Sequence, residues 1–322
     1  MLSKNRNIIL FVILVVLVGV YWWSSKVSDK QSNYRTELLN FDTAVIDQIK
    51  IVPPVDSPEF TLNKGASGWV VKDAQKQFTA DNKVVARNLD LLNGIAVKRM
   101  ASKNASMHEQ FAVTPDKGTL LELFSNGKKM GDLMLGKFDY FQPQNAQPDP
   151  YGRQPQGEMV FYASIPGEPA VYVIDGQVGF GIGKDMSSFR VKTLVNLDKN
   201  QITEVVMENS GQETNRLVKQ GSSWLFNDKV ADSAKVAQYI TRISHQNGSK
   251  FAETNLVEGL PLASKIKIMG DGFPEVVLQS YQQDSVNFLV TSSQNTESVF
   301  LDNGNKLTDR LVEDDEFFHP KK

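Results

Sequence analysis

The sequence contains no cysteine. This absence excludes disulfides, thiol catalysis and thiolate metal sites, and it also excludes the lipid that bacterial lipoproteins carry on a cysteine. A chain of 322 residues can bury a core large enough to fold without disulfides. A domain of this kind outside the cell therefore fits a bacterial periplasm better than a eukaryotic cell surface.

Histidine is scarce, with three residues at His108, His245 and His319. His108-Glu109 lacks the second histidine of an H-E-x-x-H zinc site. We place His245 at the end of a predicted helix, where an imidazole favours the negative terminus, and His319 in the C-terminal tail. We expect surface or helix-end roles for all three, and no metal or cofactor.

Motifs for nucleotide binding and serine catalysis are also missing. The glycines at 179, 181 and 183 are followed by Lys184 and Asp185. A phosphate-binding loop needs Gly-x4-Gly-Lys and then a hydroxyl, and this segment has neither the spacing nor the hydroxyl. No Gly-x-Ser-x-Gly elbow occurs. We expect the glycine segment to be a flexible crossover, because glycine permits positive φ.

Carboxylates and tryptophans give no catalytic pattern either. The acidic candidates lie near a proline-rich segment and in the tail: Asp139, Asp149, Glu158, Asp314, Asp315 and Glu316. A glycosidase pair needs two carboxyls at a fixed separation, which sequence alone does not supply, so we expect charged surface. Trp69 and Trp224 are expected to be core anchors and not sugar-stacking platforms. We therefore predict no catalytic, cofactor-binding or metal residues, and no enzymatic activity.

Charge is unevenly distributed along the chain, although the net charge is only −2. Residues 1–35 carry five Lys and Arg against one Asp, a net +4, and residues 197–322 carry thirteen against eighteen, a net −5. No basic stripe follows the N-terminal excess, so binding to nucleic acid is not expected. The positive segment would lie beside anionic lipid headgroups if the neighbouring apolar run is in a membrane.

That apolar run, Ile8–Trp23, has sixteen residues without a charge. As a helix it spans roughly 24 Å, slightly less than the hydrocarbon core of a bilayer. Lys4 and Arg6 precede it and aromatic residues close it, which favours a cytoplasmic N-terminus. The alternative is a cleaved secretory signal, but aromatics stand where a small-x-small cleavage site would be expected. We predict an uncleaved single-pass anchor in the bacterial inner membrane, with most of the chain in the periplasm.

The remainder of the chain contains an internal sequence repeat. Ile46, Ile49 and Ile51 recur 156 residues later as Ile202, Val205 and Met207. Each set is followed by a turn and a tryptophan strand, by a helix with apolar residues on one face, and by further strands. We predict an α+β chain made of two tandem copies of a mainly antiparallel sheet-plus-helix unit. The predicted parts are an anchor over 1–25, a linker over 26–40, a first repeat over 41–190, a second repeat over 191–311 and an acidic tail over 312–322.

Two segments depart from the repeat. Residues 142–156 hold four prolines and five glutamines, which prevent a strand ladder and favour an extended loop. This loop is either an exposed insertion without a role or a contact arm for a partner. The tail over 312–322 carries four consecutive acidic residues, and we expect it to be a solvated or frayed end.

Several short motifs are shared with one family. They are Phe41-Asp42, Ile49-x-Ile51, Trp69, Phe111-Ala-Val-Thr-Pro115, Leu135-Gly136-Lys137, Ile165-Pro166-Gly167, Val171-Tyr172-Val173 and Ser188-Phe189-Arg190. With the short anchor, they make the chain resemble the bacterial membrane-anchored family catalogued as domain of unknown function 4340. The resemblance implies an accessory component that works with a transporter-type ATPase and permease and with a gliding-motility-like membrane subunit. It carries over no catalytic residue.

We therefore expect a non-enzymatic periplasmic interaction subunit of an ABC-transporter-type inner-membrane complex. Its expected contact surfaces are the anchor, the 142–156 loop and the exposed sheet edges. The alternative is a periplasmic ligand-binding or hydrolytic domain that acts on envelope polymer, with its site in a cleft between the repeats.

Overall fold

The computed structural model describes residues 35–55, 57–142, 157–182, 185–253 and 257–320. Contacts divide these residues into two units. The first unit comprises the residues up to Lys76 together with Asn82–Ser188, and the second comprises Gln77–Asp81 together with the residues from Phe189 onward. No helix within the described ranges is both long and apolar enough to cross a membrane. The predicted anchor at 8–23 and loop residues 143–156 lie outside those ranges.

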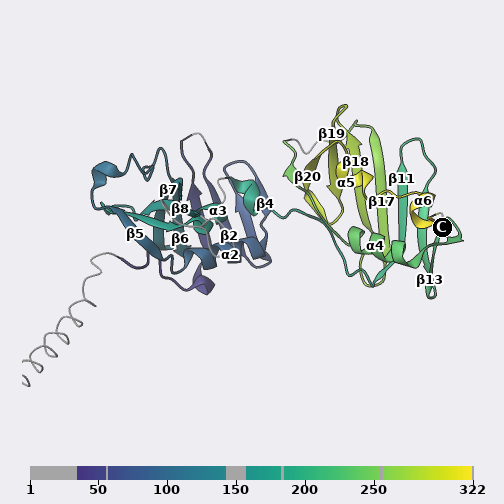
Figure 1. The fold of residues 1–322 in the computed structure, drawn as a ribbon, viewed down its shortest axis with the longest axis horizontal. Helices are drawn as coiled ribbons and strands as arrows, with labels where there is room; N and C mark the ends of the chain where they lie inside the picture. The colour runs from purple at the N-terminus through teal and green to yellow at the C-terminus, as the bar shows by residue number, and fades with distance from the viewer. Residues whose placement is uncertain (1–34, 56, 143–156, 183–184, 254–256, 321–322) are drawn as a thin grey trace, which may run out of the picture. The chain divides into compact units, whose positions relative to one another are not determined.

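The first sheet has nine strands in the order β4-β3-β2-β1-β6-β7-β8-β9-β5 (Figure 1). Its strands are β1 (Gln48–Val52), β2 (Phe60–Gly65), β3 (Gly68–Lys72), β4 (Gln77–Thr79), β5 (Val97–Ser102), β6 (Thr119–Ser125), β7 (Lys128–Phe141), β8 (Glu158–Ser164) and β9 (Val171–Asp175). Helix α2 (Asn82–Leu92) joins β4 to β5, and α3 (Gly176–Gly181) follows β9. Short 3-10 turns are η1 (Thr43–Val45), η2 (Ala105–Met107) and η3 (Met186–Phe189).

The second sheet also has nine strands, in the order β14-β13-β12-β11-β17-β18-β19-β20-β16. They are β11 (Ile202–Asn209), β12 (Asn215–Gln220), β13 (Ser223–Phe226), β14 (Lys229–Val230), β16 (Lys250–Phe251), β17 (Leu262–Gly270), β18 (Val276–Gln282), β19 (Asn287–Ser292) and β20 (Asn295–Asn303). Strands β10 (Thr193–Asn196) and β15 (His245–Asn247) form a separate pair. The helices are α4 (Ser233–Ile243), α5 (Lys306–Asp309) and α6 (Asp315–Phe318).

The two sheets have the same strand order. Each begins with four strands that pair in sequence, then a helix, then an edge strand on the far side of the sheet, and each ends with a four-strand meander. The described sheet pairings are antiparallel, and a short helix follows the last strand in both units. The prediction of an α+β chain built mainly from antiparallel sheets is confirmed.

Alternating apolar residues determine which strand face is buried. In β1 the side chains of Ile49 and Ile51 are buried and their neighbours are only half-buried. Helix α2 buries Val85, Leu89 and Leu92, which share one face at helical spacing. Each Å² of apolar surface that these contacts remove from water stabilises the fold by about 25 cal/mol, and this burial holds the helix to the sheet.

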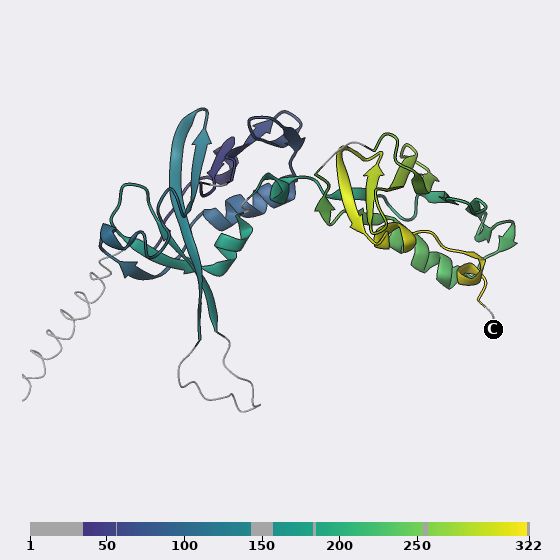
Figure 2. The same ribbon diagram turned by 90° about the horizontal axis from the view of Figure 1, so that it is seen from above.

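In the second unit, helix α4 also packs its apolar face against the sheet. Val236, Ile240 and Ile243 are buried against the strands of the second sheet. Asp232 caps the helix, because its carboxylate accepts the N–H groups of Ala234 and Lys235 at 2.9 and 3.0 Å. Helices α4, α5 and α6 lie on the same side of the sheet (Figure 2).

The C-terminal tail belongs to this core, so the prediction of a solvated or frayed end is wrong. Leu311 and Phe318 are fully buried. The Phe318 ring lies 4.5 Å from that of Phe226 and 5.3 Å from that of Tyr239, centroid to centroid. Asp314, Asp315 and Glu316 are exposed, whereas Glu313 is partly buried, and Phe317 and Phe318, which follow the acidic run, pack against the core.

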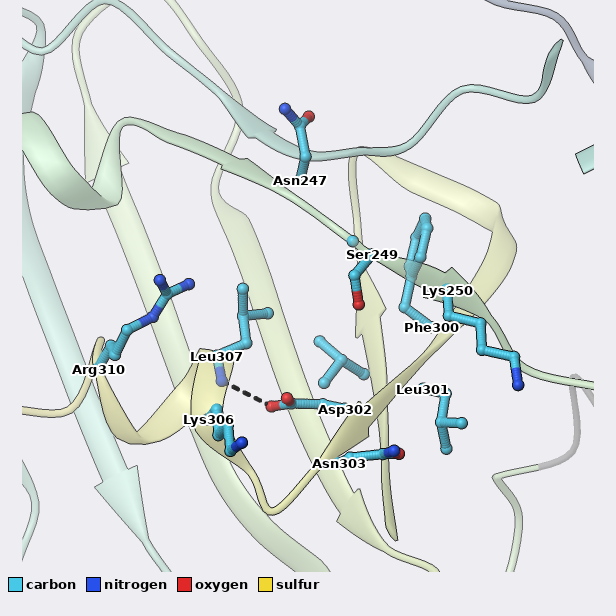
Figure 3. Close-up of a pocket in the computed structure, with 12 residues that line it drawn as sticks. Asn247, Ser249, Lys250, Phe300, Leu301, Asp302, Asn303, Lys306, Leu307 and Arg310 are labelled. Carbon is cyan, nitrogen blue, oxygen red and sulfur yellow. Dashed lines mark hydrogen bonds between the residues drawn. The ribbon is translucent and has the colours of Figure 1, made fainter. Parts of the chain in front are cut away.

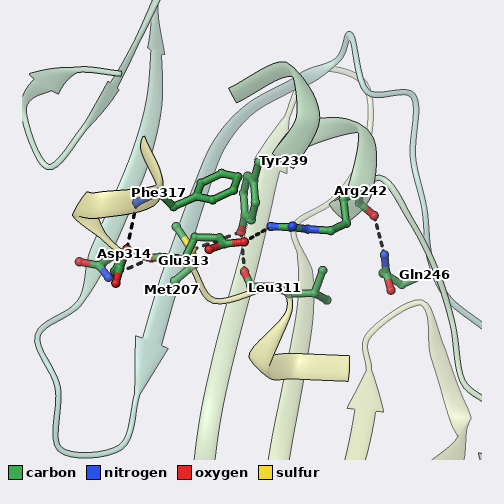
Figure 4. A network of polar contacts seen from close by, with 9 residues as sticks. Met207, Tyr239, Arg242, Gln246, Leu311, Glu313, Asp314 and Phe317 are labelled. Carbon is green, nitrogen blue, oxygen red and sulfur yellow. Dashed lines mark hydrogen bonds and ion pairs between the residues drawn. The ribbon is translucent and has the colours of Figure 1, made fainter. Parts of the chain in front are cut away.

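Polar contacts fix the tail in place (Figure 4). The buried Tyr239 hydroxyl donates to the carbonyl of Leu311 at 2.8 Å. Arg242 forms an ion pair with Glu313, and Asp314 caps α6 by accepting the N–H of Phe317 at 3.0 Å. The tail is therefore attached through both its backbone and its side chains.

The tail also has a counterpart earlier in the chain. The carbonyl of Phe318 accepts the N–H of Asp232, which precedes α4, at 2.9 Å. The carbonyl of Phe189 accepts the N–H of Asp81, which precedes α2, at 2.7 Å. Phe189 and Phe318 are both buried at the end of a short helical turn that follows the last strand. The tail thus completes a pattern that is shared by the two halves of the sequence.

Candidate functional site

Large apolar side chains lie exposed where β7 and β8 approach the segment 143–156. Phe180 is 60% exposed, Phe138 is 44% exposed, and Tyr140 and Met159 are comparably open. We call these four residues the aromatic patch. Phe138 pairs with Phe161 across the β7–β8 ladder and Tyr140 pairs with Met159, so these side chains share one face of the sheet.

The rings of the patch contact one another. Phe138 and Phe180 lie 5.3 Å apart between centroids, and each is within 5.6 Å of the buried ring of Phe161. These separations are typical of favourable aromatic pairs. Phe161 thus anchors the rings from below, and Phe138 and Phe180 present their outer faces to solvent.

Helix α3 brings Phe180 to this position, so the prediction of a flexible glycine crossover is wrong for residues 179–181. Asp175 caps the helix by accepting the N–H of Gln177 at 2.9 Å. A side chain on Gly179 would collide with the ring of Phe161, and one on Gly176 would come within 2.8 Å of the carbonyl of Met159. The glycines therefore serve close packing of a helix on a strand, and not chain reversal.

Ion pairs border the patch. Lys98 on β5 bonds Glu158 and also lies 3.0 Å from Asp175, the cap of α3. These bonds raise the pKa of Lys98, and the pKa of Asp175 is lowered mainly by the N–H of Gln177. An apolar centre with a charged border is the usual composition of a protein–protein contact.

The acidic residues considered from the sequence do not converge. Asp139 accepts a hydrogen bond from the Tyr162 hydroxyl at 2.9 Å, and the pKa of Tyr162 is raised to about 12 by burial and by this carboxylate. Glu158 is engaged by Lys98, while Asp149 lies outside the described residues. In the tail Asp314 caps α6, Asp315 bonds His319, and Glu316 is an exposed residue of the same helix.

The histidines are likewise separate. His108 Nε2 lies 3.1 Å from the carbonyl of Pro169. His245 begins β15 directly after Ser244, the C-cap residue of α4. Its Nδ1 lies 2.9 Å from the Ser244 hydroxyl. Within the described ranges, no group of three or more His, Asp or Glu residues is placed to hold a metal ion.

Trp69 is a core residue, with 7% of its surface exposed. Trp224 is only partly buried and packs against the core of the second unit. Neither ring is exposed as a stacking platform.

Two of the motifs that suggested a family meet in the first unit. The N–H of Lys137 donates to the carbonyl of Phe111 at 3.1 Å, at a bulge in β7. A side chain on Gly136 would collide with the same carbonyl. Phe111 in turn packs on Tyr162, with ring centroids 4.4 Å apart. These motifs therefore hold the segment before β6 against the sheet, which is a structural role.

A third motif holds residues of the second unit together. The guanidinium of Arg190 lies between the rings of Phe78 and Phe251, 3.4 and 3.7 Å from their centroids. It also donates to the hydroxyl of Ser298 at 2.9 Å. Burial lowers the pKa of Arg190 to about 10, which leaves it charged at neutral pH. The sandwich joins Gln77–Asp81 to the strands that follow Phe189.

The chain is thus a scaffold of two antiparallel sheets with the same strand order. The motifs described above, which suggested a family, hold parts of this scaffold together. A family model described as a domain of unknown function (DUF4340) matches residues 69–260, more than half of the chain, and the chain belongs to this family. Comparison with curated proteins and with solved structures gives no match.

Proposed function

We propose that this chain is a non-enzymatic, membrane-anchored periplasmic subunit that docks onto an ABC-transporter-type inner-membrane complex. The aromatic patch is its contact surface in the first unit. The partner is the permease or a gliding-motility-like membrane subunit of that complex, as the family resemblance implies. The proposal retains the predicted anchor at 8–23 followed by two tandem copies of one unit.

The aromatic patch is the observation that carries this proposal. Aromatic and methionine side chains are enriched at the buried centres of interfaces, and contiguous exposed groups of them are uncommon on monomers. Phe138 and Phe180 rest on the buried ring of Phe161, so they are held in place before any partner arrives. Such preorganised rings lose little entropy on docking.

Two further features support the proposal. An N-terminal helix at 8–23 would confine the chain to the plane of the membrane and raise its effective concentration beside a membrane partner. The proline-rich segment 142–156 connects β7 to β8 directly beyond Tyr140 and Met159. It remains our candidate for an additional contact arm.

The patch is tested by polar substitution. In a full-length Phe138→Ser/Phe180→Ser variant, we expect the amount of co-purified membrane subunit to fall at least about tenfold, since central aromatic residues often contribute 2 kcal/mol or more to binding. The measurement is affinity purification from membranes in mild detergent, with quantitative mass spectrometry. Unchanged recovery of the partner would refute the patch as its contact.

A matched control is available in the second unit. Val230 and Val286 are 68% and 56% exposed. The Val230→Ser/Val286→Ser variant removes exposed apolar surface away from the patch, so partner recovery should stay at the level of the unmodified chain. A comparable loss in this control would show that the effect is not specific to the patch.

The alternative of a domain acting on envelope polymer requires exposed rings beside convergent carboxylates. Trp69 is buried, and Asp139 and Glu158 are each engaged by a neighbouring side chain. The described residues thus favour docking.

A further inference from the structure

The second unit contains a cavity of about 490 Å³ between β16, β20 and α5 (Figure 3). Three cationic side chains line it, Lys250 from β16 and Lys306 and Arg310 from α5 and the residue after it. Within the described residues, none of the three lies within 4 Å of a carboxylate in an ion pair. The two lysines therefore carry charge that is available to a ligand, whereas the charge of Arg310 also acts on Asp302 and lowers the pKa of that carboxyl.

The floor of the cavity is apolar. Val290 and Phe300 pair across β19 and β20, and Leu307 of α5 closes one side. A side chain on Gly248 would collide with the Phe300 ring, so glycine at this position leaves room for that ring, which is fully buried together with Val290 beneath the cavity. The volume falls in the range of pockets that hold small organic molecules.

One acidic residue at the cavity, Asp302, lies near the end of the last strand of its sheet. Asp175 ends the last strand of the first sheet, and each of the two carboxylates accepts a backbone N–H from the short helix that follows its strand. Asp302 is only partly exposed and lines the cavity.

Asp302 positions α5. Its carboxylate accepts the N–H of Leu307 at 2.8 Å. Burial raises the pKa of Asp302, and the N–H groups of Leu307 and Thr308 oppose that shift. Burying a carboxylate is costly unless it is hydrogen-bonded, and these N–H groups supply the hydrogen bonds. Its effect is to hold Lys306 and Arg310 at the cavity.

We propose that this cavity binds a small amphiphilic organic anion, bearing a phosphate or carboxylate head on an apolar body. The body lies against Leu301 and Leu307, and the head group lies beside Lys306 and Arg310, whereas Lys250 lies at the opposite end of the cavity (Figure 3). The three cations together with Asp302 and the neighbouring Asp309 carry three positive and two negative charges, a formal +1, which favours an anion. Arg310 supplies a planar fork for two oxygens of the head group, and Lys306 adds a point charge.

The test uses the full-length chain in a neutral detergent and 1-naphthyl phosphate as probe. Isothermal titration calorimetry, corrected by a detergent-only titration, should give saturable binding. Arg310→Ala and Lys306→Ala should each weaken it about tenfold, since each removes a charge-assisted contact. Arg310→Lys should recover part of the loss. Lys219→Ala, an exposed lysine on β12, should leave binding unchanged.

Two related compounds separate the parts of the proposal. Inorganic phosphate should bind more weakly than the probe because it lacks the apolar body, and uncharged 1-naphthol should bind more weakly because it lacks the anionic head. Equal binding of either compound overturns the proposal, and so does no binding of the probe or equal binding by both alanine variants. Should Arg310→Ala fail to fold, Lys306→Ala decides the same question.

Discussion

Replacing Phe318 by alanine is expected to cost the second unit about 3–5 kcal/mol of unfolding free energy, the usual range for a buried phenylalanine. Phe318 is fully buried, stacks on Phe226 and contacts Tyr239 edge-on. Its removal also releases α6, which Asp314 and Glu313 hold to the core. Hydrogen-exchange mass spectrometry of α4 peptides should show faster exchange throughout that helix.

Glu316 provides the control for this prediction. It is an exposed residue of the same short helix, so Glu316→Ala should change stability by less than about 0.5 kcal/mol. If Phe318→Ala leaves the protection of α4 at the level of Glu316→Ala, the tail is a frayed end after all and its place in the core is wrong.

Trp69→Ala is expected to destabilise the first unit by a similar amount, about 3–5 kcal/mol. The side chain is buried in β3, and its backbone N–H donates to the Asn82 side chain at the start of α2 at 2.9 Å. Loss of the ring leaves a cavity between strand and helix. The protection of β1 to β3 peptides against hydrogen exchange should fall accordingly.

Trp224→Ala is the comparison for Trp69→Ala. Trp224 occupies the corresponding strand but is only partly buried, so its replacement should cost less because less apolar area is lost. Equal costs, or an unchanged first unit in Trp69→Ala, would contradict the assignment of Trp69 as the core anchor of its sheet.

Periodicity was enough to predict much of the fold. Alternation around Ile49 and Ile51 identifies a half-buried strand, and the spacing of Val236, Ile240 and Ile243 identifies the buried face of a helix. These signals are local, since they depend only on which side of an element faces the core. The motifs that resembled the family led to the correct family because they lie at turns and close contacts that the fold requires.

The corrections arise where local signals were ambiguous. The tail reads as solvated from its acidic residues, yet Leu311 and Phe318 are buried beneath them. The glycines at 179 and 181 suggested chain flexibility, but Gly179 allows α3 to approach β8. In both segments, a tertiary partner distant in the sequence decides the conformation.

The candidate sites required the fold itself. Phe138 and Tyr140 share one face of β7, but the strand alternation through Leu135 does not predict which face, because a bulge in β7 lies between Leu135 and Phe138. The opposing Met159 and the ring of Phe180 come from later segments. The cationic cavity likewise gathers Lys250 and Arg310 from segments that no sequence spacing relates.

The most direct test of the account is photo-crosslinking in native membranes. A photoreactive phenylalanine analogue at position 180 of the full-length chain should form an adduct with an integral membrane subunit, whereas the same analogue at the exposed position 230 should not. An adduct at 180 identified as a permease-type or gliding-motility-like subunit is the predicted result. No adduct at 180, or the same adducts from both positions, would contradict docking through the aromatic patch.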